Sequence, residues 1–300
     1  MKIIKDLEYI KKACVGLGFF DGVHIGHKKL LETLTSQAKK YNTSSVVVTF
    51  KNSPAEIFSK NVEYLTTLSE REQLIEMYNI DYMIELDFDE NLKNITAEDY
   101  LENILVKYLS PIYIVSGFNH TFGKGKVGNP EFLKEQQKKY NYKYEEIPSV
   151  KINEEIISST KIKQYLHENK VEEANKLLGR NYSISGTVIR GNQIGRKIGF
   201  PTANIDYPEK KVKISNGAYK AVVTHNGQTY TGLLNYGYKP TVSANITKPV
   251  AEVHIIGFNK DIYGENIEIS VIKKIRDEKR FNSTDELKQQ IIKDKEICLE

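Results

Sequence analysis

The chain has 300 residues, 43 Lys and Arg against 39 Asp and Glu, and a formal net charge of +4. This length favours two domains, because one hydrophobic core rarely grows so large. The mild, interleaved charge argues against a nucleic-acid-binding stripe, while a charged N-terminus and the lack of an apolar run near ~20 residues argue against a signal peptide or a membrane span. We therefore expect a cytoplasmic protein that binds neither nucleic acid nor membranes, with Cys14 and Cys298 as free thiols and an oligomeric state that the sequence leaves open.

The first predicted unit is a strand, a glycine-rich turn and a helix. Residues 13–17 form an apolar run, residues 28–41 carry leucines at helical spacing, and residues 18–27 between them read Gly-Phe-Phe-Asp-Gly-Val-His-Ile-Gly-His. Such a turn presents unpaired N–H groups at a helix start, where the helix dipole also favours a phosphate. His24 and His27 can donate hydrogen bonds to phosphoryl oxygens whose charge grows in a transition state. The alternative is a surface turn with two incidental histidines.

The same stretch resembles the H-x-G-H signature of the nucleotidyltransferase superfamily, whose members move an adenylyl or cytidylyl group. Class I aminoacyl-tRNA synthetases share this tetrapeptide, so the rest of the chain has to identify the substrate. Nothing in the sequence resembles an anticodon-binding domain.

Alternating strands and helices follow this motif. Apolar, β-branched runs predict strands, and periodic apolar residues with Thr96 and Asn129 as N-caps predict helices. The expected strands are 44–50, 81–86, 112–115 and 142–147, and the expected helices are 69–78, 96–109 and 129–140. This order predicts a parallel sheet covered on both faces, with ligands outside the carboxyl ends of its strands, where the first motif falls.

Two later segments suit the same site. Residues 116–129 hold four glycines and two lysines, and we expect this loop to fold over a phosphate chain. Ser159 and Thr160 are expected near the start of a helix from which Lys161 and Lys163 project cations. A flexible surface loop and simple helix capping are the respective alternatives.

Residues 1–180 resemble the N-terminal half of bacterial bifunctional riboflavin kinase/FAD synthetases, through 18–27, the Gly-Phe-x-x-x-Phe-Gly at 117–123, and 157–163. The resemblance implies a Rossmann-like nucleotidyltransferase domain in which His24 and His27 act in adenylyl transfer from ATP to FMN. It implies binding roles for Gly18, Phe20, Asp21, Gly26, Asn119, Ser159, Thr160 and Lys163. Relatives usually carry Asp at Asn119, Arg at Lys163 and Pro-His-Pro at 52–54; Lys163 keeps the charge but lacks the bidentate fork.

The pattern changes at Gly179, where a helix over 171–178 ends and short alternating strands begin. We therefore place domains at 1–180 and 181–300. The expected strands are 182–190, 219–225, 228–234, 250–256 and 268–274, with a hairpin turn at Asn226-Gly227. They predict a small antiparallel β-barrel, closed by a helix that starts at a Ser283/Glu286 capping box and continues to about Asp294. The fold class of the whole chain is α/β.

A loop within residues 186–204 carries the chemistry of this half. Gly191, Gly195, Arg196 and Gly199 suit phosphate contact, although the glycines alone could form a plain β-turn. Thr202 and Asn204 alternate on one side of an extended segment and offer two oxygens to a hard cation such as Mg²⁺.

Residues 180–294 resemble the riboflavin kinase signature, mainly through Phe-Pro-Thr-Ala-Asn at 200–204. The resemblance implies ATP and Mg²⁺ as cofactors, binding roles for Pro201, Asn235 and Arg276, and Glu252 as the general base. A base is needed because the ribityl hydroxyl of riboflavin is a poor nucleophile while protonated, whereas the phosphate of FMN is already anionic. Glu252 shares a strand face with His254, and we expect it to point into the barrel mouth; a surface glutamate is the alternative.

Together these features predict a bifunctional enzyme that forms FMN from riboflavin and ATP in the barrel, and FAD from FMN and ATP in the N-terminal domain. Two alternatives stay open. One is a monofunctional riboflavin kinase with an impaired adenylyltransferase domain, and the other is a regulator that binds flavin or nucleotide without turnover.

Overall fold

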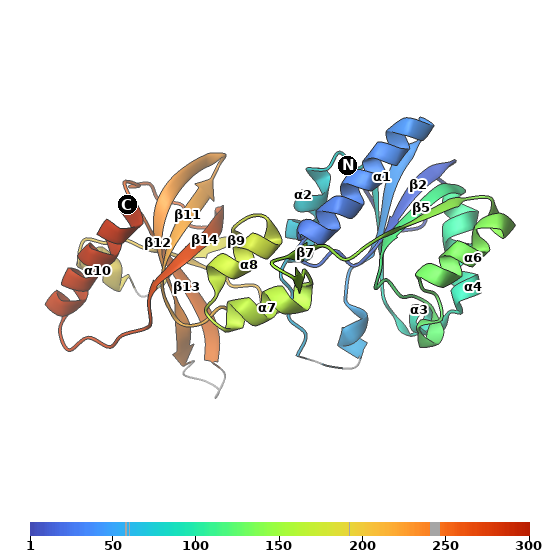
Figure 1. Cartoon of the computed structure of the whole chain (residues 1–300). Coiled ribbons are helices and arrows are strands. Elements are labelled where there is room, and N and C mark those ends of the chain that lie inside the picture. Colours follow the sequence, from blue (N-terminus) through green and yellow to red (C-terminus); the bar gives the residue numbers. More distant parts are fainter. Residues whose placement is uncertain (58, 60, 192, 241–246) are drawn as a thin grey trace. The chain divides into compact units, whose positions relative to one another are not determined.

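The computed structural model describes residues 1–57, 59, 61–191, 193–240 and 247–300, and the chain divides into two compact units, Met1–Ser159 and Thr160–Glu300 (Figure 1). Helix α7 (Ser159–His167) begins at this division, and α8 (Val171–Leu178) packs against strands of the second unit. The domain boundary at Gly179 therefore stays a prediction. In the part of the chain that the structure describes, no helix has the length and apolar character needed to cross a bilayer.

The first unit contains a six-stranded sheet in which every neighbouring pair is parallel, as predicted. Its order is β1-β4-β3-β2-β5-β6. The strands are β1 (Lys2–Ile4), β2 (Ala13–Leu17), β3 (Ser44–Phe50), β4 (Tyr82–Leu86), β5 (Pro111–Gly117) and β6 (Lys143–Ile147). β2 lies in the interior of the sheet, which puts the turn that follows it at the middle of the carboxyl edge.

Two apolar clusters cover the two faces of this sheet, because neighbouring residues of a strand point to opposite sides. Cys14 of β2 belongs to the cluster under α1, and Val15 belongs to the cluster under residues 97–109. The helices are α1 (Ile25–Tyr41), α2 (Leu68–Glu76), α3 (Glu90–Asn94), α4 (Ala97–Asp99), the π-helix η2 (Tyr100–Val106), α5 (Lys107–Leu109) and α6 (Pro130–Tyr140). Shorter elements are η1 (Pro54–Ile57), η3 (Lys124–Lys126), β7 (Lys151–Ile152) and β8 (Glu155–Ile156).

The second unit is a closed antiparallel barrel, in the order β10-β13-β12-β11-β14-β9, which confirms the predicted architecture. The strands are β9 (Tyr182–Ile189), β10 (Ala203–Ile205), β11 (Gly217–His225), β12 (Gln228–Pro240), β13 (Thr247–Ile255) and β14 (Asn266–Arg276). Fully buried side chains such as Tyr219, Leu234 and Val253 fill its interior. A short helix, α9 (Ile194–Lys197), interrupts the loop between β9 and β10.

Helix α10 (Thr284–Leu299) packs on the outside of the barrel against β11 and β12 (Figure 1). Its N-cap is Ser283, whose hydroxyl accepts the Glu286 N–H at 3.1 Å, as the capping box predicts. It continues to Leu299, beyond the predicted end near Asp294, because Cys298 packs against Ala218 and Leu233. Both cysteines are free, as expected, and burial raises the pKa of Cys14 and of Cys298 to about 11.

Candidate active sites

The turn over residues 18–27, which follows the carboxyl end of β2, has an unusual backbone conformation. Phe20 (φ 59°) and Val23 (φ 38°) are left-handed although neither is glycine, and both are buried. Each such residue costs about 1–3 kcal/mol of strain and persists only where surrounding packing holds it. Gly22 (φ 81°) is required, since a Cβ there would lie 2.6 Å from Leu65 Cδ1.

The two histidines of the motif meet at the N-terminus of α1. His24 is the N-cap, and its Nδ1 accepts the backbone N–H of His27 at 3.3 Å. Their rings stack with centroids 3.7 Å apart and planes 14° from parallel. Gly26 lies against the His24 ring, where a Cβ would be 3.1 Å from the nearest ring atom. The helix therefore begins three residues earlier than predicted, and both imidazoles lie where the helix dipole favours phosphate.

Two other residues of the motif are buried in the scaffold. Phe20 is fully buried in the cluster under α1, next to Gly18. Asp21 is also buried, and its Oδ1 accepts the backbone N–H groups of Leu65 at 2.8 Å and Thr66 at 3.2 Å. These contacts give both side chains a role in holding the turn, so their direct contact with a ligand stays a prediction.

Ser159 of the 157–163 segment contacts the same turn. Ser159 Oγ donates to the carbonyl of Asp21 at 2.8 Å. Thr160 and Lys163 follow on α7, in the second compact unit, and their binding roles stay predictions.

The loop after β5, residues 118–129, is held in place by Phe122. Phe122 is buried against Tyr100 and Phe132, and it forms a β-bridge with Gly128. Asn119, three residues before Phe122, is exposed. Burial lowers the pKa of the next residue, His120, to about 4, so its ring is neutral.

Residues 52–54, which differ from the Pro-His-Pro noted above, are held by side-chain hydrogen bonds of Asn52. Asn52 Nδ2 donates to the Phe88 carbonyl at 3.0 Å, and Asn52 Oδ1 accepts the Phe88 N–H at 2.9 Å. Lys51 pairs with Asp87 at 2.7 Å beside it. The loops that follow β3 and β4 are therefore joined at the carboxyl edge of the sheet.

In the barrel, four predicted site residues lie in one row across neighbouring strands. Asn204 of β10 is opposite Glu252 of β13, which is opposite Asn235 of β12; Ala218 of β11 then continues the row to Arg276 of β14. Directly opposed residues point to the same face of a sheet. The fold thus brings together side chains that are up to 72 positions apart in the sequence.

This row lies on the outer wall of the barrel. Ala251 and Val253 are fully buried and point inward, so Glu252 and His254 point outward, toward α10. The shared face of Glu252 and His254 is as predicted. Glu252 does not point into the barrel mouth, as we expected, because apolar side chains fill the barrel interior. It points into the space under α10 instead, where a cavity is present.

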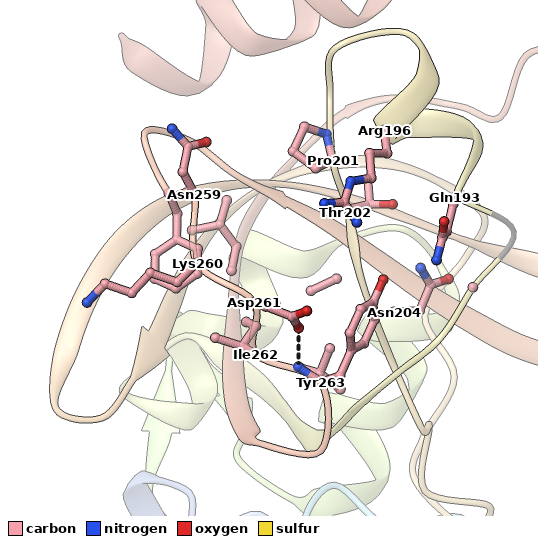
Figure 2. A pocket seen from close by; sticks show the side chains of 15 residues that line it. Gln193, Arg196, Pro201, Thr202, Asn204, Asn259, Lys260, Asp261, Ile262 and Tyr263 are labelled. Carbon is pink, nitrogen blue, oxygen red and sulfur yellow. Dashed lines mark hydrogen bonds between the residues drawn. The ribbon is translucent and has the colours of Figure 1, made fainter.

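Two cavities meet on this wall. The helix-side cavity, of about 310 Å³, is lined by Glu252, Asn235 and Arg276 on the barrel and by Phe281, Leu287 and Ile291 from the C-terminal segment. The loop-side cavity, of about 440 Å³, is lined on one side by Arg196, Pro201 and Thr202 and on the other by Asn259, Lys260 and Asp261 (Figure 2). Gly191 and Phe258 also line it. Gln193, Thr202 and Asn204 line both cavities.

Backbone contacts fix the segment between the cavities. His254 Nδ1 donates to the Pro201 carbonyl at 2.8 Å, and burial lowers the pKa of His254, which favours the neutral ring. Gly191 lies against the Asn204 amide, where a Cβ would be 2.7 Å from Asn204 Oδ1, so a larger residue there would displace this side chain. Gly195 and Gly199 lie in or beside α9, on the same loop.

A buried ion pair that the sequence did not indicate holds Arg276. Asp294 of α10 is 1% exposed; its Oδ2 accepts Arg276 Nε at 2.9 Å, and its Oδ1 accepts Gln290 Nε2 at 2.9 Å. The one sequence signal was the helical spacing of Gln290 and Asp294, four residues apart, which does not identify a partner on β14. The pair couples α10 to the wall that carries Glu252.

We expect Asp294→Asn to raise the KM for the substrate of the helix-side cavity about tenfold and to lower the free energy of unfolding by about 1–3 kcal/mol, since a charged hydrogen bond is lost. Saturation kinetics and denaturant unfolding measure the two effects. Glu296→Gln, an exposed carboxylate on the same helix, is the matched control. An unchanged KM in Asp294→Asn would show that Arg276 needs no such support.

Comparisons with known proteins cover both units. A family model described as FAD synthetase matches residues 6–161, and one described as riboflavin kinase matches residues 178–300. Proteins described as bifunctional riboflavin kinase/FMN adenylyltransferase are similar over nearly the whole chain. The protein of Buchnera aphidicola subsp. Schizaphis graminum is 40% identical over 99% of this chain and 97% of its own, and that of Escherichia coli is 34% identical over 98% and 96%.

A solved structure is also similar over the whole length. It is a crystal structure described as a macrolide-efflux protein from Streptococcus pneumoniae, with a TM-score of 0.89 and 31% identity over 99% of each chain.

Proposed function

The chain belongs to the bifunctional riboflavin kinase/FMN adenylyltransferase family, and from this premise we propose how its residues divide the two reactions. The enzyme phosphorylates riboflavin to FMN with ATP, and it transfers the adenylyl group of ATP to FMN to give FAD. In this proposal the barrel performs the first reaction and the N-terminal unit performs the second. The separate matches of the two family models to the two halves support this division.

For the kinase reaction, the meeting of the two cavities at Thr202 and Asn204 carries the proposal. Riboflavin occupies the helix-side cavity, where Phe281, Leu287 and Ile291 offer an apolar wall to its ring system. ATP occupies the loop-side cavity, so that its γ-phosphate and the ribityl hydroxyl meet where the cavities join.

Glu252 is the general base of this reaction. It lies directly opposite both Asn204 and Asn235 in the strand register and lines the riboflavin cavity. It removes the proton of the ribityl hydroxyl as the oxygen attacks the γ-phosphorus, and ADP leaves. Arg276, held by Asp294, lies at the far end of the same row and supplies positive charge to the site.

A Mg²⁺ ion fits the junction by the chemistry of its donors. Thr202 offers a hydroxyl oxygen and Asn204 an amide oxygen, and Mg²⁺ prefers such hard oxygen ligands together with substrate phosphates. When bound there, the ion neutralises charge on the transferring phosphoryl group. We therefore expect chelation of divalent cations to stop FMN formation.

We expect Asn204→Ala to raise the Mg²⁺ concentration needed for half-maximal FMN formation at least about tenfold, the effect of losing roughly 1.4 kcal/mol of binding. Mg²⁺ titrations at saturating ATP measure this. Asn266→Ala, on an exposed position of β14, is the control. The same Mg²⁺ requirement in wild type and Asn204→Ala would remove Asn204 from the metal site.

Adenylyl transfer needs alignment and charge stabilisation more than a base. The phosphate of FMN attacks the α-phosphorus of ATP, the bond between the α- and β-phosphates breaks, and pyrophosphate leaves. His24 and His27, at the N-terminus of α1, donate hydrogen bonds to the phosphate oxygens as charge develops there. Gly18 and Gly26 let the backbone approach these phosphates, and Asn119 and Ser159 border the same edge of the sheet.

We propose that this second site is active despite its departures from the family pattern. The reciprocal amide bonds of Asn52 with Phe88 supply the rigidity that prolines supply elsewhere. Lys163 retains the positive charge of the usual arginine. A cytoplasmic location remains part of the proposal, in keeping with the small-molecule substrates.

A further inference from the structure

We infer that Arg71 is a positioning residue for adenylyl transfer: its guanidinium joins the backbone carbonyls of Phe19 and Phe50, and thereby fixes the turn that presents His24 and His27. The inference rests on the proposed role of those histidines. Arg71 lies on α2, outside every motif that the sequence singles out.

The guanidinium contacts the carboxyl ends of two neighbouring strands at once. Nη1 donates to the Phe19 carbonyl at 3.0 Å, and Nη2 donates to the Phe50 carbonyl at 2.6 Å. The same group lies over the Phe19 ring, 4.6 Å from its centroid, and Arg71 is 2% exposed. A planar fork with several donors can hold two carbonyls in a fixed geometry, whereas an ammonium group is a single point charge.

The turn needs support from outside because its backbone is strained. Left-handed Phe20 directly follows Phe19, and left-handed Val23 comes three residues after Phe20. The residues before α2 add two further attachments: the backbone N–H groups of Leu65 and Thr66 bind Asp21, and Thr66 Oγ1 accepts the Gly22 N–H at 3.0 Å. Residues 65–71 therefore contact the turn at Phe19, Asp21 and Gly22, and Arg71 also contacts Phe50 at the end of β3.

Two nearby carboxylates bear on how Arg71 can be replaced. Glu85 is opposite Thr49 in the strand register, and Thr49 Oγ1 itself donates to the Phe19 carbonyl at 3.1 Å. Asp21 and Glu85 both favour the charged form of Arg71 and so oppose the lowering of its pKa by burial. Glu85 is fully buried, and burial raises its pKa to about 7, so it can take up a proton if the neighbouring charge is removed.

The test compares Arg71→Lys and Arg71→Gln with wild type in both reactions of the full chain. Displacing a catalytic group by about 1 Å costs up to roughly 10²-fold, so we expect kcat for FAD formation from FMN to fall by about 10²-fold in Arg71→Lys. KM for ATP and FMN should change little, and FMN formation from riboflavin should be unchanged. Gln73→Ala, exposed on the same helix, should leave both reactions unaffected.

Histidine NMR separates positioning from a general structural role. The imidazole resonances assigned to His24 and His27 should shift in Arg71→Lys and Arg71→Gln, and should stay in place in Gln73→Ala. A kcat within about twofold of wild type in Arg71→Gln would overturn the inference, as would equal losses in both reactions or unmoved histidine signals. If wild type itself made no FAD, the proposed role of the histidines would fail instead.

Discussion

Glu252→Gln is expected to abolish FMN formation while FAD formation from supplied FMN continues at the wild-type rate. General-base catalysis contributes about 10²–10⁴-fold, and glutamine keeps the shape of the side chain without its basic oxygen. Because Glu252 lies on the outer barrel wall between Asn204 and Asn235, the substitution removes no packing from the barrel interior. The loss should therefore fall on kcat for riboflavin phosphorylation, with little change in KM for ATP.

Chromatographic separation of flavins after incubation with riboflavin and ATP measures the first reaction, and incubation with FMN and ATP measures the second. Glu268→Gln, a glutamate on strand β14 of the same barrel, is the matched control and should retain both reactions. Loss of both reactions in Glu252→Gln would show that the division of labour is wrong. Undiminished FMN formation would show that another group accepts the proton.

His27→Ala is expected to have the complementary effect. FAD formation should fall by about 10²–10³-fold, the usual cost of removing one preorganised donor from a site where charge develops. FMN formation should continue, because in the proposed division of labour the barrel supplies its own base and its own ATP cavity. His27 is a better target than His24, since His24 is also the N-cap of α1 and its loss would cost about 0.5–2 kcal/mol of stability.

The matched control for this substitution is Glu32→Ala, on the same helix. Glu32 makes one exposed ion pair with Lys28, and such pairs contribute little. Rates of FAD formation at saturating FMN and ATP compare the two variants. Wild-type rates in His27→Ala would contradict the assignment, and they would leave the turn with a purely structural function.

The fold could be predicted from the sequence wherever an element was long enough to show a pattern. Strands β2 to β6, α1, α6, the barrel and α10 all follow from apolar periodicity, caps and turn residues. The strands β1 and β10 contain three residues each, which is too few for a pattern, and pairing with a neighbour creates them. Strand β12 exceeds its predicted length because its partner β13 continues the ladder.

The sites were predictable where the chemistry is local in the sequence. His24 and His27 are three residues apart on one turn, and Thr202 and Asn204 are two residues apart at the start of β10, so spacing brings each pair together. Arg71 and Asp294 could not be identified this way, because their partners Phe19, Phe50 and Arg276 are brought to them by tertiary packing. In the periodic pattern of a helix, each of these two residues is simply another polar position.

The mixing experiment tests the central claim, two separate sites in one chain, most directly. Glu252→Gln and His27→Ala are each incubated with riboflavin, ATP and Mg²⁺, alone and together, and the flavins are separated over time. We expect no product from Glu252→Gln, FMN alone from His27→Ala, and FAD from the mixture, because FMN made by one variant is the substrate of the other. A mixture that stops at FMN, or variants that lose the same reaction, would contradict it.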